Sequence, residues 1–89
     1  MDNEELLIKV KKGLGITGDY QDGTLNVHID EVKQYMLSAG VSQATIDSQI
    51  SIGTIIRGVS DLWDYGSGST GLSPYFIERC IQLREKGDD

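Results

Sequence analysis

The two residues with the most reactive side chains are Cys80 and His28, and each is the only one of its type in the chain. A catalytic cysteine needs an adjacent base and a third group that orients that base, and no suitable partner is evident for either residue. One cysteine cannot form an internal disulfide, and one cysteine with one histidine cannot supply the four ligands of a structural zinc site. We therefore expect Cys80 in the core and His28 packed at its flank, with no catalytic residue, metal or cofactor.

Glycines near the end of the chain raise the question of a phosphate site. Gly66, Gly68 and Gly71 lie close together, but the lysine of a P-loop is absent beside them and no strand precedes them. The segment 65–72 is rich in glycine and serine, which is typical of a flexible loop.

A third chemical motif involves Asp47 and Ser48. Acyl carrier proteins, which are small acidic four-helix domains, attach a phosphopantetheine arm to the serine of an Asp-Ser-Leu motif at a helix start. Asp47 and Ser48 resemble the first two positions, whereas Gln49 stands in place of the leucine and the preceding segment lacks that family's usual glycine. An acyl-carrier-like domain is therefore the least favoured of the functions considered.

The elements that position these residues are predicted to be helices, because apolar residues recur at helical spacing and glycines separate the runs. Acidic residues open the first run and lysines close it, which complements the helix dipole. In chain order, we expect helices at 2–14 with an end marked by Gly13 and Gly15, from a cap at Thr17 or Asp19 to Gly40, from a cap at Ser42 or Thr45 to about Asp64, and from Ser73-Pro74 to a frayed end at 87–89.

The strongest periodic signal covers 52–63 and predicts a long central helix. Gly53 and Gly58 lie inside it, and each costs about 1 kcal/mol relative to alanine, so we expect a neighbouring element to approach closely there. The last helix is expected to bury Phe76, Ile77, Cys80, Ile81 and Leu83. The predicted core is Leu6, Val10, Leu25, Ile29, Val32, Met36, Ile52, Ile55, Ile56, Val59, Leu62, Trp63, Phe76, Cys80 and Ile81.

Length and charge limit the classes of partner. The 89 residues suit a single all-α domain, 1–89, with a core thin enough that partners would add stability. The net charge of -6 disfavours gripping of DNA, because binding of phosphates relies on lysine and arginine. No leader and no apolar run of about 20 residues is evident, so we expect a cytoplasmic protein without a membrane span.

A protein-interaction surface is expected around the end of the central helix. Arg57 and Asp61, four residues apart, lie opposite its apolar stripe and form either a solvated pair or part of a subunit contact. The loop that follows could become ordered against a partner. The candidate interface residues are Arg57, Asp61, Tyr65, Gly66, Ser67, Gly68, Ser69, Thr70, Gly71, Leu72 and Tyr75; Ile8, Val27 and Leu37 also lie off the predicted stripes.

The order of these pieces resembles one family over nearly the whole chain. Leu14-Gly15-Ile16-Thr17 with Asp19 and Asp22, the helix ending in 38–41, the run from Ile52-Gly53 to 61–65, the Gly/Ser loop and the final Ser73-Pro74 helix are similar to head-tail connector (adaptor) proteins of tailed bacteriophages and prophages.

This resemblance implies a structural virion protein rather than an enzyme. Identical subunits would form a ring beneath the portal, line part of the DNA channel without binding DNA specifically, and offer a docking platform for tail or stopper proteins. The subunits would assemble in the bacterial host cytoplasm. A ring of this kind needs two different contact faces on each subunit. The alternative from another class is a small regulatory or scaffold domain that binds one protein partner.

Overall fold

The computed structural model describes residues 2–65 and 72–87, and all regular structure in these residues is helical. The elements are α1 (Asn3–Leu14), α2 (Asp22–Ser38), α3 (Gln43–Ile46), the 3-10 helix η1 (Gln49–Ser51), α4 (Ile52–Tyr65) and α5 (Pro74–Gly87). The predicted all-α class, with more than half of the chain helical, is confirmed.

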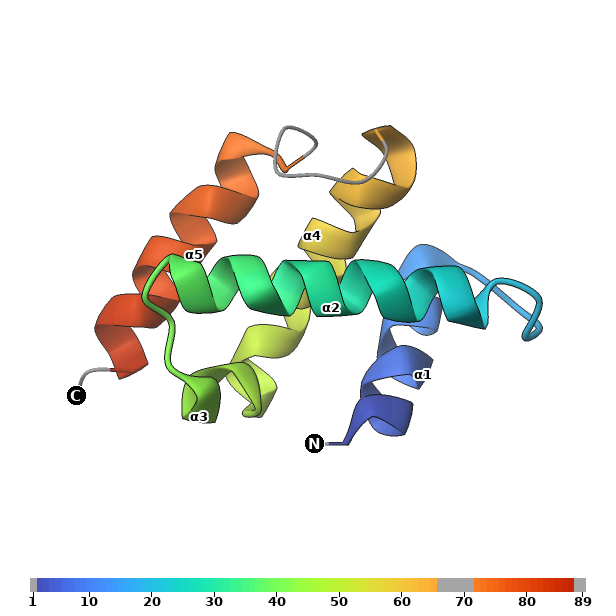
Figure 1. Ribbon diagram of the computed structural model, residues 1–89, viewed down its shortest axis with the longest axis horizontal. Coiled ribbons are helices and arrows are strands. Elements are labelled where there is room, and N and C mark those ends of the chain that lie inside the picture. Colours follow the sequence, from blue (N-terminus) through green and yellow to red (C-terminus); the bar gives the residue numbers. More distant parts are fainter. Residues whose placement is uncertain (1, 66–71, 88–89) are drawn as a thin grey trace.

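Helix α4 is the central element of the packing, since it contacts α1, α2, α5 and η1. Figure 1 shows α2 running across α4, with α1 on one side and α5 on the other. Helix α1 begins at the lower edge of this view, whereas α5 begins at the upper edge. The chain thus places the starts of its first and last helices at opposite edges of the molecule.

Both ends of α1 and the start of α5 follow from short local patterns. The Asp2 carboxylate accepts a hydrogen bond from the Glu5 amide at 2.7 Å, and Gly15 closes α1 with a φ of 71°. At the start of α5, the Ser73 hydroxyl accepts from the Phe76 amide at 3.2 Å, ahead of Pro74. The predicted end at Gly15 and the predicted cap at Ser73 are confirmed, whereas Asp2, predicted as the first residue of the helix, is instead its N-cap.

The start of α2 differs from the prediction. The residue before this helix is Gln21, which makes no side-chain capping bond, so neither Thr17 nor Asp19 is the N-cap. A turn with Gly18 at a φ of 77° precedes the helix, and Asp22 pairs with Lys11 of α1 at 2.8 Å. A contact between two helices therefore accompanies this start in place of a local cap.

The third predicted helix is broken into three pieces. Ser42 caps the short α3, as expected, by accepting from the Thr45 amide at 3.2 Å. Ser48 then adopts an extended conformation, and its hydroxyl donates to the Thr45 carbonyl at 2.6 Å. The Ser51 hydroxyl similarly donates to the Ile46 carbonyl at 2.6 Å. Serine side chains that bond to nearby carbonyls compete with a continuous helix, which explains why α4 begins only at Ile52.

The core consists largely of the predicted side chains, with three kinds of difference. Ile52, Ile56 and Trp63 are only partly buried, and Ile81 is 42% exposed. Ile77 is also exposed, because α5 buries a narrower stripe at spacings of four and three residues. That stripe is Phe76, Cys80 and Leu83. The core also contains three residues that the prediction omitted: Val41, Ile46 and Leu72.

Candidate protein-interaction site at the α4–α5 junction

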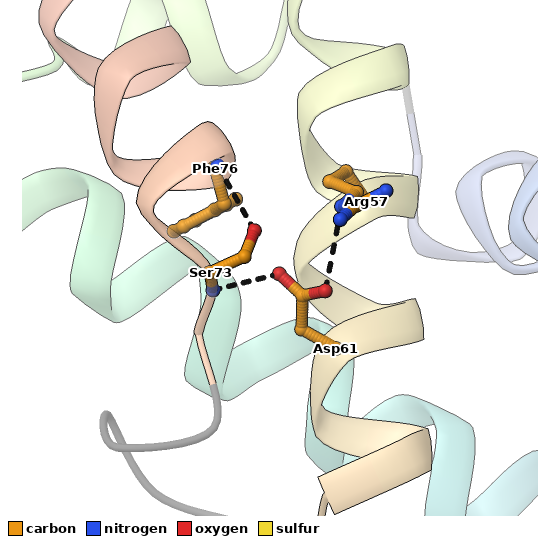
Figure 2. A network of polar contacts seen from close by, with 4 residues as sticks. All are labelled: Arg57, Asp61, Ser73 and Phe76. Atoms are coloured by element: carbon orange, nitrogen blue, oxygen red, sulfur yellow. Dashed lines mark hydrogen bonds and ion pairs between the residues drawn. The ribbon is translucent and has the colours of Figure 1, made fainter.

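A buried carboxylate joins α4 to the start of α5. Asp61, which is 4% exposed, accepts a hydrogen bond from the Ser73 amide at 2.9 Å. Its other oxygen lies 3.3 Å from Nε of Arg57, one turn earlier in α4. Figure 2 shows both contacts converging on Asp61 between the two helices. Asp61 therefore fixes the start of α5 and holds one edge of the Arg57 guanidinium.

The outer part of this junction consists of Arg57 and Tyr75. The guanidinium lies 5.3 Å from the centre of the Tyr75 ring, within the range of a cation–π contact. The Arg57 side chain is 48% exposed and Tyr75 is 58% exposed. We call this pair the Arg57–Tyr75 patch. It combines two residue types that are enriched at the centres of protein interfaces, and their predicted interface role stays a prediction.

Two other predicted interface residues are buried against this chain. Asp61 was expected on a solvated or partner-facing surface, but its carboxylate is enclosed and bonded to Ser73 and Arg57. Leu72 was expected to await a partner, but it is 6% exposed and belongs to the core. Burial of Leu72 therefore gives the segment before α5 an apolar anchor within this chain, where an anchor on a partner was expected.

The remaining predicted interface residues lie outside the described residues or are described only in part. Tyr65 is the last residue of α4, and its side chain is not described. Gly66, Ser67, Gly68, Ser69, Thr70 and Gly71 lie outside the described residues. The structure thus brings together Arg57, Asp61 and Tyr75 of the predicted set, with Ser73 as the link that the sequence analysis had assigned only to capping.

Sequence reasoning missed two surface features. A pocket of about 290 Å³ lies beside the same junction, lined by Glu31, Gln34, Tyr35, Ser38 and Leu72. It depends on packing between segments distant in sequence, so no local pattern indicates it. Tyr20, in the turn before α2, is 96% exposed. Its flanking acidic and glycine residues were the only signal that this aromatic side chain would face solvent.

Cys80 and His28, the residues with the most reactive side chains, are both buried. Burial raises the pKa of the Cys80 thiol to about 11, so the thiol is protonated at neutral pH and is a poor nucleophile. His28 packs edge-on against Trp63, with ring centres 6.1 Å apart, which confirms that it is a packed residue. Its Nδ1 has no hydrogen-bond partner among the described residues. Ser48, the possible attachment site of a prosthetic arm, is partly buried and donates to Thr45.

Neither a group of metal-binding residues nor a membrane-spanning helix is found in the part of the chain that the structure describes. Within 2–65 and 72–87, no group of three or more histidine, cysteine or acidic residues could hold a metal ion. None of the helices in these same ranges has the length and apolar character required to span a membrane.

Comparison of the chain with protein-family models, with curated proteins and with solved structures gave no match. The features of this chain that bear on function are the order of its sequence elements and the α4–α5 junction.

Proposed function

We propose that this protein is a structural virion protein, a head-tail connector of a tailed bacteriophage or prophage. Its subunits form a ring between the portal and the tail, line part of the DNA channel, and offer a docking platform for tail or stopper proteins. The proposal rests on the resemblance in the order of elements along the chain, from 14–22 through the central run 52–65 to the Ser73-Pro74 start of the last helix.

The Arg57–Tyr75 patch is the structural observation that best supports a role in protein contacts. An exposed arginine normally loses side-chain entropy when it binds, and this loss weakens the contact. Here Asp61 and the Tyr75 ring already restrict the guanidinium, while about half of the Arg57 side chain stays accessible. A partner that binds the patch therefore has less arginine motion to restrict.

Charge supports the proposed channel role. A net charge of -6 disfavours tight contact with phosphates, so DNA can pass a ring of such subunits without being held. The protonated, buried Cys80 and the packed His28 offer no nucleophile and base pair, which favours a structural role over an enzymatic one.

Assembly in solution tests the proposal. Sedimentation velocity over a concentration series, paired with electron microscopy of negatively stained particles, is expected to show closed rings, at least when portal protein is present. Particles purified from infected or induced cells are expected to contain the chain at the head–tail junction. A chain that stays monomeric under all these conditions and binds one regulatory protein would instead support the alternative of a small scaffold domain.

Intact-mass measurement tests the acyl-carrier alternative. The chain purified from its native host is expected to have the mass of the unmodified polypeptide. A phosphopantetheine adduct on Ser48 would overturn the connector proposal.

A further inference from the structure

The Arg57–Tyr75 patch has donors left for a further carboxylate. A guanidinium has five N–H donors, and the ion pair of Arg57 uses Nε at 3.3 Å from Asp61. The two terminal amino groups have no hydrogen-bond acceptor among the described residues. These groups form the edge that binds carboxylates in paired hydrogen bonds.

An acidic segment of the same chain matches this edge in charge. Asp2, Glu4 and Glu5 form the densest acidic run in the described sequence, and all three are exposed. The Asp2 carboxylate caps α1, whereas the carboxylates of Glu4 and Glu5 have no hydrogen-bond or ion-pair partner within the described residues.

No hydrogen bond or ion pair joins Arg57 or Tyr75 to Glu4 or Glu5 within the described residues of one subunit. Helix α1 begins at one edge of the molecule and α5 begins at the opposite edge (Figure 1). A contact between two different surfaces of identical subunits is head-to-tail and repeats from subunit to subunit.

We propose that the Arg57–Tyr75 patch of one subunit binds the carboxylates of Glu4 and Glu5 of a second copy of this chain. Asp61 orients the guanidinium, Tyr75 covers one of its faces, and the terminal amino groups donate to the incoming carboxylate. This contact rests on the proposed function, because it supplies one of the two faces that a ring of identical subunits requires.

Removal or reversal of the charges at this contact tests it in the full chain. Arg57→Gln and the double variant Glu4→Lys/Glu5→Lys are each expected to weaken self-association by about tenfold or more in sedimentation velocity, as loss of a central arginine contact does. Tyr75→Ala is expected to weaken association while leaving the Arg57–Asp61 pair intact. The matched control Asp30→Lys/Glu85→Lys makes the same change in net charge at exposed positions elsewhere and is expected to leave the Arg57-dependent contact in place.

Mixing of variants tests the pairing directly. Arg57→Glu chains and Glu4→Lys/Glu5→Lys chains are each expected to associate poorly alone and to associate with one another when mixed. Circular dichroism of each variant checks that the fold is retained. Wild-type association that is unchanged in Arg57→Gln and in Glu4→Lys/Glu5→Lys would overturn this contact and leave the connector proposal standing. A wild-type chain that never self-associates, even with portal protein, would overturn both.

Discussion

Helix α4 contains two glycines, Gly53 and Gly58, and the two have opposite surroundings. A Cβ added at Gly58 would lie 2.7 Å from the Phe76 ring and 2.9 Å from Val32. Both side chains can pack this closely against α4 only because residue 58 has no Cβ. A Cβ added at Gly53 would meet nothing within 4 Å. The prediction of a close approach is therefore confirmed at Gly58 and wrong at Gly53. A glycine inside a helix indicates close packing only when a neighbouring element happens to lie over it.

A similar contrast holds for two buried polar side chains of α4. Asp61, in the second half, is buried with two partners. Thr54, in the first half, is 2% exposed, and its hydroxyl has no partner among the described residues. The stretch from Gly58 to Asp61 is thus tied to α2 and α5, whereas the stretch at Gly53 and Thr54 retains an open backbone position and an unsatisfied hydroxyl.

The largest effect is expected from Asp61→Ala. This change removes the acceptor of the buried Ser73 amide and the partner of Arg57, so unfolding free energy is expected to fall by about 2–3 kcal/mol. Asp61→Asn can retain an acceptor for Ser73 and is expected to lose less. Urea unfolding monitored by circular dichroism measures both. Equal losses in the two variants would show that the negative charge, rather than the Ser73 bond, carries the contribution.

Gly58→Ala is expected to destabilise the fold by about 1–3 kcal/mol, because the added methyl overpacks the space between Phe76 and Val32. Thermal and urea unfolding measure the change. The double variant Gly58→Ala/Val32→Ala relieves one of the two clashes, so its loss is expected to be smaller than the sum of the two single losses. A Gly58→Ala variant as stable as the wild type would contradict the close approach.

Thr54→Val is expected to stabilise the protein by about 1 kcal/mol, because it replaces an unsatisfied buried hydroxyl with a methyl group of similar size. The matched control is Thr45→Val. Thr45 is also buried, but its hydroxyl accepts from Ser42 at 2.9 Å, so this control is expected to destabilise. Destabilisation by both variants would mean that the Thr54 hydroxyl has a partner in solution.

The smallest effect is expected from Gly53→Ala, with a stabilisation of about 0.5–1 kcal/mol from helix propensity alone, since the position is open. Measured beside Gly58→Ala, the same substitution in the same helix should change sign. A loss of stability at Gly53 would remove the contrast between the two glycines of α4.

At the candidate site, the exposure expected from sequence is correct for Arg57 and Tyr75 and wrong for Asp61 and Leu72, while their interface role stays a prediction. Arg57 and Tyr75 are exposed, as their positions off the apolar stripes indicated. Asp61 and Leu72 are buried, because Asp61 is bonded to Ser73 at the start of α5 and Leu72 packs in the core. The position of an aspartate on the polar side of a helix does not indicate that a residue from another segment is its hydrogen-bond partner.

The sequence by itself determined the all-α class, both ends of α1, the caps of α3 and α5, and most of the core. Each of these depends on residues within about one or two helical turns, such as Asp2 with Glu5 or Ser73 with Phe76, so short-range chemistry suffices. Tertiary structure decided the requirement for glycine at position 58, the burial of Asp61 and the pairing of Lys11 with Asp22. These features join segments far apart in the chain, and their energies exist only once the helices pack.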